Sequence, residues 1–145
     1  MIISYFSKVI IILVIFCIAP HQVSASPWNL INDDDLKFLH DLQTAVREHD
    51  KKWIANNTTF PFWIWQNNPK KLIKSKREFY RNYDIIITKK IERLILNQRD
   101  DNIFKNDIGL MFGRGDLWIG IMCKKTCVGD VYYNLMTFND TSKLR

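Results

Sequence analysis

The stretch DIGLMFGRGDLWIGIMCKKTCVGDVYYNLMTFN, Asp107–Asn139, decides the fold of this chain. Its apolar runs are bounded by turn residues, a pattern that predicts short β-strands. We place these strands at Ile108–Phe112, Leu117–Met122 and Val131–Phe138. Gly113–Asp116 supplies the first tight turn, because glycine and aspartate are the residues that such turns require. The stretch therefore predicts an antiparallel meander that the upstream elements must cover.

The N-terminus has the pattern of a secretory signal peptide, which we assign to residues 1–25. Lys8 precedes the apolar run Val9–Ala19, which is too short to span a membrane, and Val23–Ala25 offers a cleavage site. No later segment is apolar enough to cross a membrane. The sequence thus predicts an exported protein, periplasmic or secreted, whose single α+β domain spans residues 26–145.

The charge and the cysteines fit this compartment. A net charge of +6 is modest and widely spread, and export argues against nucleic acid as a partner. Loss of Cys17 with the signal peptide leaves Cys123 and Cys127, which we predict to form a disulfide. A metal site would need two more ligands, and neither His40 nor His49 lies near them in sequence. Since the chain also lacks a glycine-rich phosphate loop, we expect no cofactor and no metal.

Upstream of the meander, apolar residues at helical spacing predict one long amphipathic helix, about Asp34 to Ala55. Asn32 or Asp33 can cap it. The aromatic segment Thr58–Gln66 then predicts a strand, with Pro61 near its start or at a sheet edge. One face of this strand carries Phe60, Phe62 and Ile64, and the other carries Trp63 and Trp65.

Two short helices are predicted next. Ser75 and Glu78 fit a capping box ahead of Tyr80 and Tyr83, and Thr88 can cap a helix over Lys89–Leu96. The polar segment up to the meander predicts a loop. The resulting order indicates an α+β fold, with a long N-terminal helix and two short helices packed on a curved antiparallel sheet of about four strands.

Two segments carry a resemblance to a known family. Glu78–Thr88 (EFYRNYDIIIT) and Asn106–Ile119 (NDIGLMFGRGDLWI) resemble the packing and turn motifs of uncharacterised exported bacterial proteins. Those proteins are similar to the cystatin-like cone superfamily typified by nuclear transport factor two and ketosteroid isomerase. The resemblance implies a bent sheet and helices around a conical cavity, and a homodimer through the open sheet face. Members of that superfamily include enzymes, binders of small apolar ligands and association modules, so the fold does not decide the function.

Three polar residues are candidates for acid–base catalysis: His49, Asp50 and Asp84. The alternative for His49 is a hydrogen-bonded histidine in an apolar stripe, and Asp50 next to two lysines is typical of a solvated surface. We favour these structural roles.

Five aromatic residues are candidates for binding a ligand or a partner, because such rings combine a large apolar surface with a polar tip. Ordinary packing is the alternative for each of them. They are Trp63, Trp65, Tyr80, Tyr83 and Trp118.

Arg114-Gly115-Asp116 spells the tripeptide that integrins bind, but in a hairpin tip we interpret it as a turn.

Three functions remain open at the level of sequence. The one that we favour is a non-catalytic exported binding module that holds a small apolar ligand or an envelope protein in the cone cavity or on the aromatic strand. The second is an immunity or inhibitor protein against an envelope-acting enzyme. The third is a small lyase, isomerase or hydrolase, which would require that His49, Asp50 and Asp84 meet in one pocket.

Overall fold

The computed structural model describes residues 30–64, 70–124 and 131–139, so the predicted signal peptide, residues 1–25, lies outside the described part. The helices in that part are α1 (Asp33–Arg47), α2 (Lys51–Asn56), α3 (Lys76–Arg81), α4 (Tyr83–Ile86), α5 (Lys89–Leu96) and the 3₁₀-helix η3 (Asp100–Asn102). The strands are β1 (Phe62–Ile64), β2 (Lys71–Ile73), β3 (Phe104–Asn106), β4 (Gly109–Phe112), β5 (Leu117–Cys123) and β6 (Val131–Phe138).

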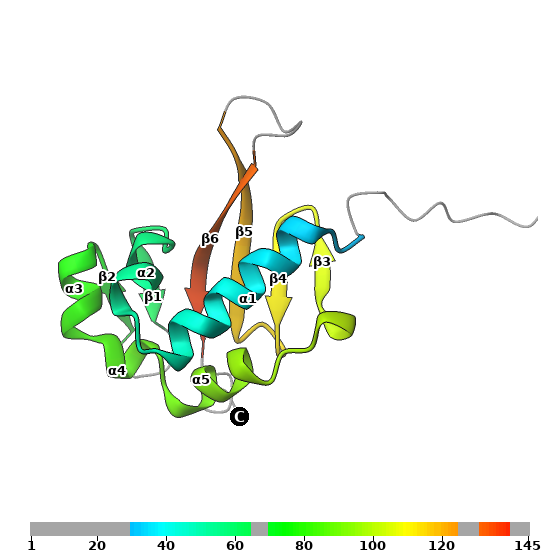
Figure 1. The fold of residues 1–145 in the computed structure, drawn as a ribbon. Coiled ribbons are helices and arrows are strands. Elements are labelled where there is room, and N and C mark those ends of the chain that lie inside the picture. The colour runs from blue at the N-terminus through cyan, green and yellow to red at the C-terminus, as the bar shows by residue number, and fades with distance from the viewer. Residues whose placement is uncertain (1–29, 65–69, 125–130, 140–145) are drawn as a thin grey trace, which may run out of the picture.

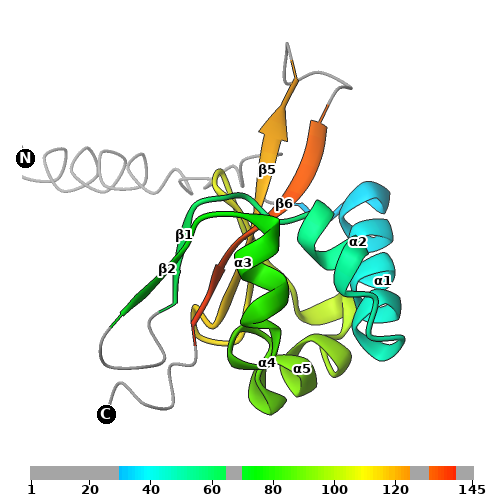
Figure 2. The ribbon, with the colours of Figure 1, turned by 90° about the vertical axis from the view of Figure 1, so that its left-hand side faces the viewer.

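The strands form one mixed sheet in the order β2-β1-β6-β5-β4-β3, in which only β1 and β6 run parallel. The predicted meander is confirmed as β4, β5 and β6. The helices cover one face of the sheet (Figures 1 and 2), which confirms the α+β class. No helix among the described residues has the length and apolarity needed to span a membrane.

The predicted single long helix is wrong, because the chain breaks between α1 and α2. His49 has a φ of 55°, and the amide of Asp50 donates to the carbonyl of Ala45 at 2.8 Å, as in a Schellman helix end. The Asp50 side chain then accepts from the amides of Lys52 and Trp53 and caps α2. Hydrophobic spacing could not reveal this break, because the apolar period continues across it.

The predicted sheet of about four antiparallel strands is also wrong, since β2 and β3 raise the number of strands to six in the described residues. Each has only three residues, too few for a recognisable alternation. The aromatic strand is shorter than predicted: β1 begins just after Pro61. Upstream of it, Thr58 contacts Leu135 through an isolated bridge.

Aromatic packing fills the space between the helices and the sheet. Phe79 from α3 lies 6.3 Å from Phe138 of β6 and 6.5 Å from Phe62 of β1, measured between ring centroids. Phe79, Phe112 and Phe138 are fully buried. The predicted capping roles of Asn32, Ser75 and Thr88 are confirmed by hydrogen bonds at the starts of α1, α3 and α5.

A buried polar cluster ties the start of α1 to two strands. The Asp35 carboxylate accepts from the Asn32 amide at 2.8 Å, from the Tyr133 hydroxyl at 2.8 Å and from the Lys105 ammonium at 2.5 Å. The side chains of Asp35 and Lys105 are 0% and 7% exposed. Burial, followed by the bond to Asp35, raises the pKa of Tyr133. The cluster therefore joins the helix layer to β3 and β6 through a shielded ion pair.

Candidate functional site

The face of the sheet that the helices leave uncovered, the outer face, carries a continuous row of side chains. Phe104 of β3 pairs with Met111 of β4, Met111 with Trp118 of β5, and Trp118 with Thr137 of β6. Ile64 of β1 pairs with Phe138 of β6 in parallel, so the residues before them, Trp63 and Thr137, are also neighbours. On its other side, Trp63 pairs with Leu72 of β2. The cross-sheet row is therefore Leu72, Trp63, Thr137, Trp118, Met111 and Phe104.

The residues before and after each member of the cross-sheet row, in the same strand, show which way the row points. Trp118 lies between Leu117 and Ile119, which are both fully buried against the helices, so Trp118 points to the other face. The same alternation directs Trp63 and Met111 outward. Six strands about 4.8 Å apart make this row roughly 24 Å long.

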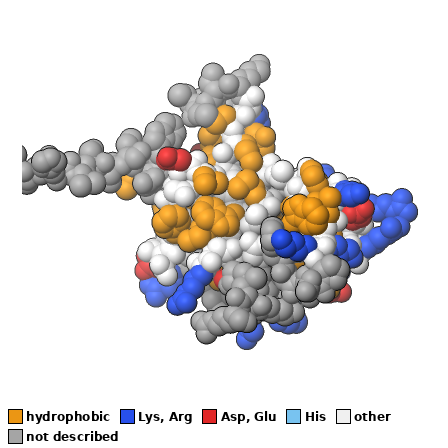
Figure 3. Space-filling model, turned by 180° about the vertical axis from the view of Figure 1, so that it is seen from behind, with side chains coloured by type: hydrophobic (Ala, Val, Ile, Leu, Met, Phe, Trp, Pro, Cys, Tyr) orange, Lys and Arg blue, Asp and Glu red, His pale blue; other side chains and the backbone are white. Residues whose placement is uncertain are grey.

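A second apolar cluster lies on the outer face along the β5–β6 hairpin. Tyr132 pairs with Met122, and a Cβ on Gly120 would come within 2.5 Å of the Met136 sulfur and 3.1 Å of the Met122 methyl group. The two methionines thus cover the space above the glycine. Figure 3 shows the resulting apolar patches over the sheet.

The outer face carries no charge on the strands of the described residues. The charged residues of the described strands are Lys71 and Lys105. Both side chains lie on the helix side of the sheet, where Lys71 bonds to Asn82 and Lys105 bonds to Asp35. Antiparallel sheets with one face in water normally alternate apolar residues inward and polar residues outward. Trp63 is 47% exposed and Phe104 51% exposed. Exposed apolar patches rimmed by polar residues are candidates for interaction surfaces.

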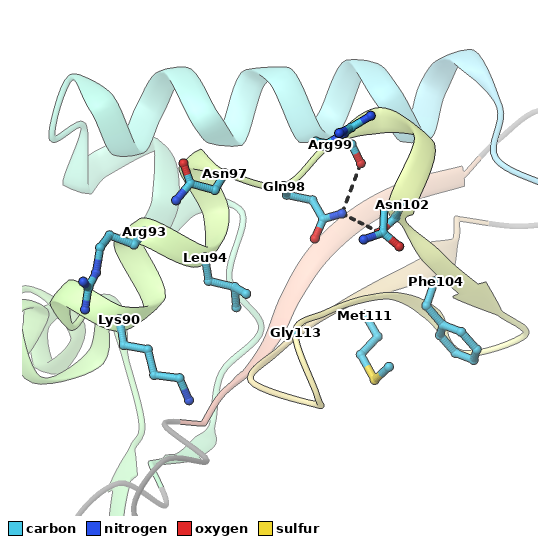
Figure 4. Close-up of a pocket in the computed structure, with 10 residues that line it drawn as sticks. All are labelled: Lys90, Arg93, Leu94, Asn97, Gln98, Arg99, Asn102, Phe104, Met111 and Gly113. Atoms are coloured by element: carbon cyan, nitrogen blue, oxygen red, sulfur yellow. Dashed lines mark hydrogen bonds between the residues drawn. The ribbon is translucent and has the colours of Figure 1, made fainter.

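A groove of about 610 Å³ adjoins the Phe104 end of the cross-sheet row (Figure 4). Leu94, Met111 and Phe104 form its apolar part, and basic and amide side chains from α5 and the following segment surround it. Gln98 is held there by bonds to the carbonyls of Arg99 and Asn102. The polar lining residues are Lys90, Arg93, Asn97, Gln98, Arg99 and Asn102.

The five predicted aromatic candidates do not form one site. Trp63 and Trp118 share the outer face, in the cross-sheet row. Tyr80 and Tyr83 lie in the helix layer, where Tyr80 is 43% exposed and Tyr83 is buried. Trp65 lies outside the described residues. A binding surface shared by the aromatic strand and the tyrosines is therefore not formed by the described residues.

The three predicted acid–base residues are partly brought together. His49 and Asp84 line one pocket of about 270 Å³, together with Tyr83 and Glu92. Asp50 instead caps α2. In the described part of the chain no hydrogen bond joins His49 to Asp84, although a catalytic pair requires contact directly or through one water. His49 and Asp84 therefore share a pocket but do not bond to each other in the described residues.

The Arg114-Gly115-Asp116 tripeptide is part of a turn, as predicted. The Asp116 side chain is 6% exposed and pairs with Lys90 of α5, and its other oxygen accepts from the Arg114 amide. A buried, paired aspartate is unsuited to presentation at a hairpin tip.

The predicted disulfide stays a prediction, because Cys127 lies outside the described residues, whereas Cys123 ends β5. We expect thiol titration of the unreduced, denatured chain without residues 1–25 to find no free thiol, since an exported chain with two cysteines pairs them. Two free thiols per chain would refute the pairing. The described residues contain no group of three or more His, Cys, Asp or Glu that could hold a metal ion.

Sequence reasoning missed Phe104, Met111, Met122, Tyr132 and Met136 as surface residues. A usable signal was present for Met111 and Met136, each of which lies next to a buried apolar residue in its strand. Met122 and Tyr132 have no buried neighbour in sequence. For Phe104 none was available, because the strand that orients it is only three residues long.

Comparison with known proteins adds no assignment: a scan against family models, a search of curated proteins and a search of solved structures each found no match.

Proposed function

We propose that this protein is a non-catalytic, exported binding module that holds a protein partner on the outer face of its sheet. The observation that carries the proposal is the cross-sheet row, five apolar side chains and one threonine in register across all six strands. An exposed apolar surface spread over several strands suits another protein, since small ligands bind in concave pockets.

The extent of the outer face supports a partner of this class. The row is roughly 24 Å long, and β5 and β6, with seven and eight residues, extend the face by roughly 25 Å in the other direction. Because the other four strands have only three or four residues, the strands of the face cover roughly 450 Å². This area is about half of the ~800 Å² that each partner buries in a standard interface, so it suits a small interface. Tryptophan and tyrosine, which the face presents, are the residues that most often dominate binding energy.

Charge favours a partner with acidic residues around an apolar centre. The chain has a net charge of +6, and the groove beside Phe104 is lined by Arg93, by Lys90, which pairs with Asp116, and by Arg99, which pairs with Asp101. Acidic groups that flank the partner's apolar surface would lie against these side chains when the row is covered, and complementary charge also accelerates association.

Row variants test this proposal with a matched control on the opposite side of the molecule. Trp63→Ser and Phe104→Ser each remove an exposed aromatic of the row, and Tyr80→Ser removes one of similar exposure from the helix layer. We expect an acidic partner captured from envelope extract to bind the Tyr80→Ser protein like wild type. The purified partner should bind the Trp63→Ser protein about 30-fold more weakly, as measured by calorimetry, because a tryptophan that anchors an interface contributes about 2 kcal/mol or more.

Three other results would contradict the proposed function. Equal weakening by Tyr80→Ser would place the contact outside the row. A homodimer in light scattering that the Trp63→Ser variant dissociates would show that a second copy occupies the face. Binding to lipid vesicles with the same residue dependence would show that a membrane surface does. Each of these results would overturn the proposal.

A further inference from the structure

Residues 70–81, which form β2, the turn after it and α3, carry the densest positive charge of the chain. Six cations and Glu78 give this basic segment a net charge of +5, against +6 for the whole chain. Neither the cross-sheet row nor the groove includes these cations, so the proposed function does not account for them. All six are exposed: Lys70, Lys71, Lys74, Lys76, Arg77 and Arg81.

The cations of β2 and α3 converge at one end of the molecule, where β2 forms the edge of the sheet (Figure 2). The Lys71 ammonium donates to the side-chain oxygen of Asn82 at 2.5 Å, and Asn82 caps α3 directly after Arg81. The lysine of β2 therefore lies over the end of α3. Figure 3 shows Lys and Arg side chains gathered at this end of the molecule, on its right-hand side.

Five of these cations have no carboxylate partner among the described residues. Lys71 and Lys76 donate to Asn82 and Asn56, whose amide oxygens are uncharged. Like charges gathered in one segment repel each other, and an external anionic surface would relieve that repulsion. In the described part of the chain, no side-chain hydrogen bond or ion pair engages the other three, which are Lys74, Arg77 and Arg81.

Exposed apolar side chains accompany the cations. Tyr80 is 43% exposed on α3, on the side away from the buried Phe79. Residues three apart share a helix face, so Arg77 and Tyr80 are neighbours on the solvent side. Ile85 of the next helix, α4, is 37% exposed. Tyrosine is enriched where a membrane meets water, because its ring lies at the level of the lipid head groups.

This arrangement favours an extended anionic surface over a small anion. Small ligands bind in concave pockets, whereas these cations lie on a sheet edge, in a turn and on the exposed side of a helix. Clusters of four to eight Lys and Arg residues are attracted to anionic lipids. A lipid bilayer also accounts for the exposed tyrosine among the cations, which charge attraction alone does not require.

We propose that the basic segment binds the protein reversibly to the surface of an anionic lipid bilayer. The ammonium and guanidinium groups lie against lipid phosphates, and Tyr80 lies at the level of the head groups. Because α3 packs on the side of the sheet opposite the outer face, membrane binding leaves that face open to a protein partner (Figure 1). The proposal does not depend on such a partner.

Sedimentation with lipid vesicles tests the proposal on the chain without residues 1–25, which keeps every described residue and lacks the apolar N-terminus. One vesicle preparation is an equimolar mixture of phosphatidylglycerol and phosphatidylcholine, and the other is phosphatidylcholine alone. We expect binding to the anionic vesicles only. Raising the salt from ~0.1 M to ~1 M should release the protein, because the Debye length falls from ~10 Å to ~3 Å.

Two double variants with the same change in net charge locate the contact. Lys74→Gln/Arg77→Gln removes two exposed cations of the basic segment, and Arg47→Gln/Arg114→Gln removes two from the end of α1 and the β4–β5 turn. At about fivefold per cation, the first should weaken binding to the anionic vesicles about 25-fold. The second should change it less than about twofold. Removing Arg77 does not threaten the fold, because a cation in the first turn of α3 opposes the helix dipole.

The aromatic variants separate this proposal from the proposed function. Tyr80→Ser should weaken vesicle binding and Trp63→Ser should not, the reverse of the dependence expected for the protein partner. Vesicle binding lost in Trp63→Ser, equal effects of the two double variants, or equal binding to neutral vesicles would each overturn the proposal. Vesicle binding unaffected by Tyr80→Ser and matched by soluble heparin would also overturn it, since a dissolved polyanion would then suffice. None of these results bears on the protein partner.

Discussion

Replacing Asp35 with alanine should lower the free energy of unfolding by about 3–5 kcal/mol. The substitution leaves the Lys105 ammonium, whose side chain is 7% exposed, buried without its carboxylate, and it removes the acceptor of the Tyr133 hydroxyl. It also removes half of the capping box at the start of α1. Since domains are stable by only about 5–15 kcal/mol, urea unfolding followed by circular dichroism should show a large shift of the midpoint.

Asp34→Ala is the matched control, because Asp34 is an exposed aspartate in the same helical turn. It removes only a favourable interaction with the helix dipole and should cost no more than about 1 kcal/mol. The double variant Asp35→Leu/Lys105→Met should be more stable than Asp35→Ala, because it removes both charges of the pair. If Asp35→Ala and Asp34→Ala cost the same, the cluster does not stabilise the fold as the geometry indicates.

Gly109→Ala should destabilise the protein by more than about 3 kcal/mol, or prevent folding. Gly109 begins β4 with a φ of 148°, and a Cβ built there would lie 1.9 Å from the carbonyl oxygen of Ile119 on β5. Neither backbone can move without disrupting the β4–β5 ladder, in which Gly109 pairs with Gly120. Thermal unfolding should therefore show a large loss, or no cooperative transition.

Gly115→Ala separates the steric clash of the new Cβ from the cost of a positive φ. Gly115 also has a positive φ, 88°, but a Cβ there would approach nothing closer than the Trp118 indole nitrogen at 3.8 Å. Alanine at this position should cost only the backbone preference, about 1 kcal/mol. A Gly109→Ala protein as stable as the Gly115→Ala protein would contradict the steric argument.

Local patterns predicted the central strands and the helix starts because each depends on residues close in sequence. Asn32, Ser75 and Thr88 cap helices through bonds to amides three residues ahead. The break at His49 was not predictable in this way, because the apolar period runs through it and the cap of α2 by Asp50 competes with continuing the helix.

The candidate sites were predictable only in part. Trp63 and Trp118 were identified by type, but their common face depends on the parallel pairing of β1 with β6, whose partners Ile64 and Phe138 are distant in sequence. The pocket likewise depends on packing, which brings His49 from α1 to Asp84 of α4.

The sequence by itself determined the alternation of the meander, the helix caps and the α+β class, since these follow from short-range hydrogen bonding and from the period of apolar residues. Only the tertiary structure decided which residues share the outer face, that Asp35 and Lys105 form a buried pair, and that a pocket forms beside Tyr83. These features depend on strand order and helix docking, which join residues far apart in the chain through contacts that no local pattern encodes.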